Sequence, residues 1–190
     1  LRTLSKREQE RFLNGNFLDD VDGALWTYDM VIKARNKEQP VITKTVVAVD
    51  PAVTHEEGSD LTGIIVASGN WKEAHVDADY SCKASPLEWA RKAVKAYYDH
   101  HAAYIVAEVN NGGDLVETVI KQIDSKIKVI KVHANKGKFA RAEPVAALYE
   151  QGKVSHAEGL DALETEMMEW VAEKSRKSPD RLDALVYAVT

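Results

Sequence analysis

The stretch Thr45-Val46-Val47-Ala48-Val49-Asp50-Pro51-Ala52 decides the fold. Apolar residues run from Val46 to Val49 without the alternation of a half-buried strand, which predicts a strand covered on both faces. The run ends in the carboxylate of Asp50, and a proline then stops it. Asp50 is therefore expected at the end of a central strand. There it either caps the following turn or belongs to a functional site, since a carboxylate is costly to bury without a partner.

Length and composition limit the classes of protein to consider. The chain has 190 residues, 45% of them hydrophobic and 29% charged, which is typical of one globular domain with appendages. No membrane segment and no signal peptide are expected. The net charge of −5 argues against coating nucleic acid by bulk charge, although it permits a locally basic site. A chain that begins at Leu1 rather than Met is expected to be a piece of a longer protein.

Hydrophobic periodicity and turn signals divide the chain into an N-terminal helical connector, 1–40, and a domain, 41–190. Helices are expected at 4–14 and from residue 22 in the connector. A short strand-like segment at 153–156 stands outside the main pattern. In the domain we predict strands at 44–50, 61–68, 71–82, 103–108 and 127–132, and helices at 85–100, 114–124, 142–151, 160–172 and 178–190.

The order of these elements predicts an α/β fold with a mixed five-stranded sheet flanked by helices. Hairpins join the first three strands, so these are antiparallel neighbours, whereas strand–helix–strand units return parallel with right-handed crossovers. One sheet order, 3-2-1-4-5 with strand 2 antiparallel, satisfies both rules. In that sheet the first and fourth strands are adjacent and parallel, so Asp50 and Glu108 are expected to leave the same edge side by side.

Two carboxylates on neighbouring strands, about 4.8 Å apart, repel each other unless a cation lies between them. A site made only of carboxylate oxygens favours Mg²⁺ or Mn²⁺. Asp183, which borders the apolar face of the last predicted helix, is the candidate third acid. The alternative for Asp183 is an ordinary N-terminal acid that matches the helix dipole, a role that suits Asp180 better.

An ordered set of short motifs along residues 44–190 resembles the nuclease domain of the large terminase subunit, the DNA-packaging motor of tailed bacteriophages. Each motif is weak alone, but the ordered set is specific. The motifs are Val-Ala-Val-Asp50-Pro-Ala, Ser59-Asp60-Leu-Thr-Gly63, Ser85-Pro-Leu-Glu-Trp89-Ala, Ile-Val-Ala-Glu108-Val-Asn, Lys136-Gly-Lys138, Arg141-Ala-Glu-Pro-Val, Leu148-Tyr-Glu-Gln-Gly-Lys-Val-Ser-His156 and Ser178-Pro-Asp-Arg-Leu-Asp183-Ala.

The resemblance implies a ribonuclease-H-like fold and a metal-dependent endonuclease that cuts concatemeric double-stranded viral DNA during packaging. It implies that Asp50, Glu108 and Asp183 bind two Mg²⁺ or Mn²⁺ ions, with Asp60 and Asp180 as further candidate ligands. Its implied partners are DNA, an ATPase domain, the portal protein and the small terminase subunit, in the host cytoplasm at the procapsid portal. No Gly-x-x-x-x-Gly-Lys-Ser/Thr motif occurs, so the ATPase itself is not expected in this chain.

A run of basic residues follows the fifth predicted strand. Lys136, Lys138 and Arg141 are expected in a glycine-containing loop, where they are the candidate contacts to DNA phosphates. The histidines at 55, 133 and 156 either assist proton transfer near the acids or are surface and structural residues.

Three rival functions remain open at this stage. A junction resolvase or a transposase-like nuclease has the same fold, and a preference for branched DNA would distinguish it. An actin-like nucleotide-binding module has a related fold, but it requires a glycine-rich phosphate loop after the first strand, where this chain has Pro51-Ala-Val-Thr-His-Glu-Glu. A docking domain with decayed acids is the last alternative, although all three expected acids are present.

Overall fold

The computed structural model describes residues 20–51, 61–109, 113–172, 174–175 and 178–190. The strands are β1 (Lys44–Asp50), β2 (Gly63–Gly69), β3 (Ala74–Asp79), β4 (Tyr104–Glu108), β5 (Val129–Val132) and β6 (Val154–His156). The helices are α2 (Tyr28–Asn36), α3 (Pro86–Asp99), α4 (Gly113–Ile123), α5 (Lys138–Glu150), α6 (Asp161–Glu169) and α7 (Asp180–Val189).

The strands form one mixed sheet in the order β5-β4-β1-β2-β3-β6. β1 pairs with β2 antiparallel and with β4 parallel, so the predicted order of the first five strands is confirmed. The prediction of a five-stranded sheet is wrong in one respect, because β6 pairs parallel with β3 and adds a sixth strand. A strand of three residues has too little periodicity to be assigned to a sheet from sequence.

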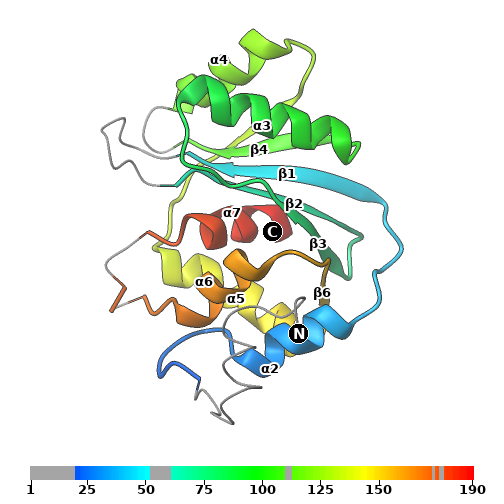
Figure 1. Ribbon diagram of the computed structural model, residues 1–190, viewed down its shortest axis with the longest axis vertical. Coiled ribbons are helices and arrows are strands. Elements are labelled where there is room, and N and C mark those ends of the chain that lie inside the picture. Colours follow the sequence, from blue (N-terminus) through cyan, green and yellow to red (C-terminus); the bar gives the residue numbers. More distant parts are fainter. Residues whose placement is uncertain (1–19, 52–60, 110–112, 173, 176–177) are drawn as a thin grey trace.

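Helices cover both faces of this sheet (Figure 1). On one face, α3 and α4 pack over a cluster that includes Val47, Val49 and Ile105. On the other, α7 packs directly against β1 and β2, with α5 and α6 beyond it. Because consecutive side chains of a strand point to opposite faces, a strand between two helical layers is apolar at every position. This explains the unbroken apolar run of β1.

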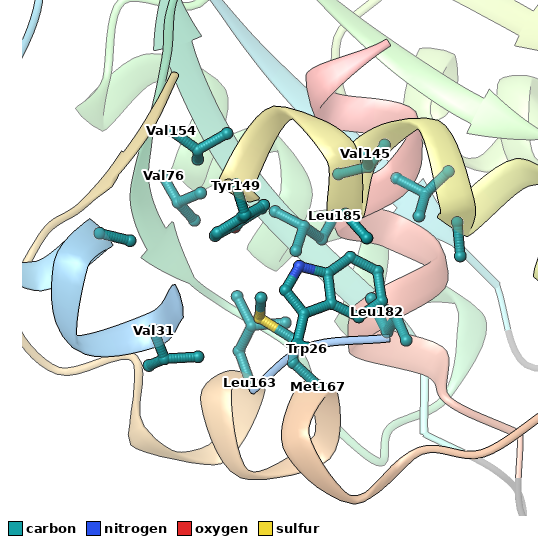
Figure 2. Packing of buried hydrophobic residues seen from close by; sticks show 14 of the residues in the cluster. Trp26, Val31, Val76, Val145, Tyr149, Val154, Leu163, Met167, Leu182 and Leu185 are labelled. Atoms are coloured by element: carbon teal, nitrogen blue, oxygen red, sulfur yellow. The ribbon is translucent and has the colours of Figure 1, made fainter. Parts of the chain in front are cut away.

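The second core lies between α7, α5, α6 and the segment that ends in α2 (Figure 2). Trp26 is only 1% exposed, and its ring meets that of Tyr149 edge to face, with 6.0 Å between the centroids. The boundary at residue 40 stays a prediction. The segment from Trp26 to Arg35 nevertheless packs into the same core as α5 and α6, rather than standing apart as an appendage.

A buried polar network joins α2 to this core. Arg35 Nε donates to Glu164 Oε2 at 2.7 Å, and Arg35 Nη2 contacts the same oxygen as well as Asp161 Oδ1 at 3.1 Å. The other Glu164 oxygen lies 2.8 Å from His156 Nδ1, and His156 Nε2 lies 2.7 Å from the Tyr149 hydroxyl. His156 is therefore a buried structural histidine, and the proton-transfer alternative for it is wrong.

Some predicted boundaries differ from the observed ones. β3 begins at Ala74 rather than at Trp71, whose side chain is 87% exposed at the preceding turn. The predicted helix at 142–151 begins earlier, at Lys138, so the basic residues from there on do not lie in a loop. The predicted helix at 4–14 lies outside the described residues. None of the helices in the described part of the chain is long and apolar enough to cross a membrane.

Candidate active site

Two predicted acids end adjacent parallel strands, as expected. Asp50 is the last residue of β1 and Glu108 the last of β4. The parallel register pairs Val49 with Ala107, so the next residue on each strand is an acid, and the two acids lie side by side at one edge of the sheet. The apolar strand residues before them fix this register, since a slip by one residue would turn the buried side chains to the wrong face.

The third predicted acid, Asp183, reaches the same edge from α7. Its side chain is almost completely buried, with 4% of the residue exposed. The contacts of Arg141 show that two of the acids converge. Its Nη1 atom lies 3.4 Å from Glu108 Oε2, and its Nη2 atom lies 3.5 Å from Asp183 Oδ1. A single guanidinium therefore spans Glu108 and Asp183, while Asp50 is close enough to interact electrostatically with both.

Polar contacts and one close backbone approach hold the start of α7 in place. The carboxylate of Glu166, on α6, accepts a hydrogen bond from the backbone N–H of Leu182 at 3.0 Å. Arg181 Nε donates to Asp79 on β3 at 2.7 Å. Just before the helix, the hydroxyl of Ser178 accepts a hydrogen bond from Lys138 Nζ at 2.6 Å. Glu166 caps the helix from another element, which a local sequence pattern does not reveal.

The backbone contact is a close approach of β2 to the first turn of α7. A Cβ added at Gly63 on β2 would lie 2.7 Å from the carbonyl carbon of Asp180, and still closer to its oxygen. Glycine is required here because only a residue without a side chain lets the first turn of α7 rest on β2. Gly63 thus sets the depth at which Asp183 enters the site.

Replacing Gly63 by Ala is expected to lower the free energy of unfolding by about 1–3 kcal/mol, the usual cost of overpacking. It should also lower the nuclease activity that the resemblance implies, because α7 must move outward and take Asp183 with it. Chemical denaturation and a plasmid-nicking assay measure the two effects. The control is Gly137→Ser, since a Cβ at Gly137 meets no atom within 4 Å. Equal stability of both variants would contradict the role given to Gly63.

Two of the three basic residues predicted to touch DNA instead contact the acids. Lys138 and Arg141 lie on the first turn of α5, and Lys138 Nζ forms an ion pair with Asp183 Oδ2. Arg141 contacts Glu108, Asp183 and the hydroxyl of Tyr187. Lys136 lies before the helix and is exposed. The loop assignment for Lys138 and Arg141 is therefore wrong, and their contact with phosphate stays a prediction.

Negative charge at this edge exceeds what the two cations balance. Burial raises the pKa of Asp50 well above its usual value, and the charges of Asp183 and Glu108 raise it further. Burial also raises the pKa of Asp183, although the neighbouring Lys138 and Arg141 oppose that shift. Raised carboxyl pKa values mean that another cation at this edge would stabilise the ionised acids.

The other candidates for the site are two acids, Asp180 and Asp60, and two histidines, His133 and His55. Asp180 is the first residue of α7 and is largely buried, and its charge contributes to raising the pKa of Asp50. Asp60 lies outside the described residues. His133 is exposed beyond β5, and His55 also lies outside the described residues.

The donor set fits a hard divalent ion. Asp50, Glu108 and Asp183 supply only carboxylate oxygens, the ligands that Mg²⁺ and Mn²⁺ prefer. Among the described residues, no three acidic, histidine or cysteine side chains already converge on a single ion position. Lys138 and Arg141 contact the two oxygens of Asp183 instead, so these cations compete with a metal ion for that carboxylate.

Lys138→Met is expected to lower the melting temperature of metal-free protein by about 2–4 °C, because Asp183 loses one of its two cationic partners. This corresponds to about 1 kcal/mol, a small value because the Lys138 side chain is 41% exposed. The rise in melting temperature on adding Mn²⁺ should become larger, since no ammonium competes for Asp183. Thermal scans with and without Mn²⁺ measure both. Lys136→Met is the control, and an unchanged Mn²⁺ response in Lys138→Met would contradict the competition.

Sequence reasoning missed Tyr187 and Glu166. Tyr187 lies one helical turn after Asp183, and its hydroxyl donates to Glu108 Oε2 at 2.7 Å. The i,i+4 spacing from Asp183 was a usable signal, because residues four apart share a face of a helix. Glu166 carried no such signal, since it caps a helix that begins fourteen residues later.

Comparisons with known proteins identify the family and the fold. The family described as the terminase RNaseH-like domain matches residues 47–190. A comparison with curated proteins finds no match.

Among solved structures, a variant nuclease domain of the large terminase subunit gp2 of bacterial virus Sf6, with manganese and beta-thujaplicinol, superposes with a TM-score of 0.67. It shares 13% identity over 88% of this chain and 98% of that one. The human cytomegalovirus terminase nuclease domain, soaked with manganese and bound to an inhibitor, gives a TM-score of 0.65 at 13% identity over 87% of this chain and 93% of the other.

A third structure shows how much of a longer large terminase the chain spans. This large terminase, from a thermophilic bacteriophage, gives a TM-score of 0.64 at 15% identity, covering 97% of this chain but 52% of that one. At these identities the likeness establishes a shared fold.

Proposed function

Because the chain belongs to the family of terminase RNaseH-like domains, we propose that it is a metal-dependent endonuclease that cuts concatemeric double-stranded DNA during viral genome packaging. One observation carries the proposal: Asp50, Glu108 and Asp183 meet at one edge of the sheet, where a guanidinium already bridges two of them. Structures of the Sf6 and cytomegalovirus nuclease domains contain manganese, which supports the binding of a divalent metal by this fold.

In this proposal the acidic residues bind the metal ions and the basic residues bind the DNA. Asp50, Glu108 and Asp183 hold two Mg²⁺ or Mn²⁺ ions, with Asp180 and Asp60 as additional ligands. Divalent ions in such a site activate the attacking water and stabilise the leaving 3′-oxygen. No nucleophilic side chain is required. The raised pKa values of Asp50 and Asp183 support cation binding by these acids, since a bound cation favours their ionised forms.

The basic residues bind the DNA backbone. Lys138 and Arg141, which pair with Asp183 and Glu108 in the metal-free chain, would supply contacts to DNA phosphates beside these acids. Lys136, exposed just before α5, extends this basic surface. Contacts to phosphate carry no sequence information, so cutting with little sequence preference follows from this arrangement.

Membership of the terminase family supports a place for this domain in a DNA-packaging motor. We place this domain in the large subunit of a packaging motor that also holds an ATPase domain, and that works with the portal protein and the small terminase subunit. The large terminase of the thermophilic bacteriophage supports the first part, since the present chain covers only 52% of it. The site of action is then the procapsid portal in the host cytoplasm.

The experiment is a nicking assay on supercoiled plasmid with Mg²⁺, Mn²⁺ or chelator. We expect open-circular and then linear DNA with either metal and intact plasmid with chelator. A parallel arm compares linear duplex with a four-way junction of the same sequence. Full activity in chelator would refute metal-dependent cleavage, and strong preference for the junction would instead indicate a resolvase.

A further inference from the structure

Tyr187 projects from α7 toward the acid edge. It lies one turn after Asp183, so both side chains leave the same face of the helix. The Tyr187 hydroxyl donates to Glu108 Oε2 at 2.7 Å. It thereby joins the two elements that carry Asp183 and Glu108, α7 and β4, through a single hydrogen bond.

Arg141 holds Tyr187 from the other side. Its guanidinium lies 5.1 Å from the centroid of the Tyr187 ring and also donates to the hydroxyl oxygen. The same guanidinium approaches Glu108 Oε2 at 3.4 Å. The phenol therefore accepts from a cation and donates to an anion, an arrangement in which each hydrogen bond strengthens the other.

Within the described residues, the hydrogen bonds and the ion pair of the Glu108 carboxylate are all made by one oxygen, Oε2. A carboxylate anchored through one oxygen has the direction of its second oxygen fixed. A ligating carboxylate with an oriented second oxygen loses little rotational freedom when an ion binds, which is why residues hydrogen-bonded to metal ligands affect metal affinity.

From this geometry we propose that Tyr187 is a positioning residue, which anchors Oε2 of Glu108 so that Oε1 is presented to the cation site. The inference rests on the proposed function, because it assigns a purpose to the orientation of a metal ligand. The Tyr187 hydroxyl contacts Glu108 and Arg141, and its influence on the cation site passes through Glu108.

The test uses Tyr187→Phe, which removes only the hydroxyl. We expect Mn²⁺ binding, measured by calorimetry without DNA, to weaken by about 10–100-fold. We expect kcat to fall by a similar factor, while KM for plasmid DNA changes by less than about twofold. The matched control is Tyr104→Phe, because Tyr104 and Tyr187 line the same surface cavity but Tyr104 contacts Lys44 and Lys128 rather than an acid.

A double-mutant cycle separates this role from a general effect on folding. In a Glu108→Ala background, which removes the acceptor oxygen as well as the charge, adding Tyr187→Phe should change Mn²⁺ binding no further. In metal-free protein, the shifts in denaturation midpoint of the two single variants should not add, since both remove the same hydrogen bond.

These measurements separate a failure of the positioning role from a failure of the proposed function. Mn²⁺ binding by Tyr187→Phe at the wild-type level, or an equal loss in both backgrounds, would overturn the positioning role and leave the nuclease function standing. Additive midpoints would also overturn it, because the anchoring bond would then contribute nothing. Wild-type protein that neither binds Mn²⁺ nor cuts DNA would contradict the proposed function and this inference together.

Discussion

Asp50→Asn should abolish metal-dependent cleavage and yet stabilise the metal-free protein. Asn keeps the shape of the side chain but removes the charge of a metal ligand. Loss of a residue that only hydrogen-bonds to a ligand lowers activity by up to about 100-fold, so we expect loss of the ligand itself to lower cleavage by at least about 100-fold. The stabilisation has a separate cause. Burial raises the pKa of Asp50, and Asp183 and Glu108 raise it further, so ionised Asp50 opposes folding.

The sign of the pH dependence follows from that shift. A carboxyl group whose pKa is higher in the folded than in the unfolded state stabilises the fold at low pH, and this contribution is lost as the pH rises through the folded-state pKa. Asp50→Asn should therefore melt at a higher temperature than wild type at neutral pH without metal. The difference should vanish as the solution is acidified through the raised pKa of Asp50. Melting scans across this pH range measure it.

Asp77→Asn is the matched control. Asp77 lies on β3, and burial raises its pKa as well. The charges that act on it are those of His75 and His100, and none of the three predicted acids is among them. We expect Asp77→Asn to cut plasmid at the wild-type rate. Wild-type cleavage by Asp50→Asn, or a loss of cleavage in both variants, would contradict the role assigned to Asp50.

Arg35→Met should destabilise the protein by about 3–5 kcal/mol, because it leaves the buried carboxylate of Glu164 with one fewer counter-charge. Glu164 is 1% exposed, and Arg35 Nε donates to it at 2.7 Å. Burial alone would raise the pKa of Glu164, but the hydrogen bonds from His156 and Arg35 outweigh it and lower that pKa. Equilibrium denaturation of the whole chain at neutral pH measures the loss.

A lowered carboxyl pKa stabilises the fold above the unfolded-state pKa, and this stability is lost as the pH falls through the folded-state pKa. The cost of Arg35→Met should therefore shrink in acid, where Glu164 is protonated in either variant. Lys37→Met is the control, because the Lys37–Glu73 pair is partly exposed and worth less than about 1 kcal/mol. Equal destabilisation by the two variants would show that the buried network does not anchor α2.

The placement of two acids could be predicted from the sequence because it depends on local rules. The apolar run before Asp50 requires a strand covered on both faces, and the strand–helix–strand order places Glu108 on the neighbouring parallel strand. Together these two rules place Asp50 and Glu108 at the same edge of the sheet. Asp183 followed from its position beside the apolar face of the last helix, which packs on β1 and β2.

The positions of Lys138 and Arg141 could not be predicted, because their partners lie on distant parts of the chain. Gly137 and Pro144 indicate a loop followed by a helix start, since proline is tolerated best in the first turn. In the structure α5 begins at Lys138 and runs through Pro144, and its first turn forms ion pairs with Glu108 and Asp183 on other elements. That one early turn redirects Lys138 and Arg141 from solvent to the acids.

The most direct test of the site is the anomalous scattering of Mn²⁺ soaked into crystals of the chain. We expect peaks within bonding distance of the carboxylates of Asp50, Glu108 and Asp183, with Lys138 displaced from Asp183. Peaks confined to other surfaces, with the Lys138–Asp183 and Arg141–Glu108 ion pairs intact at saturating Mn²⁺, would contradict the proposed metal site.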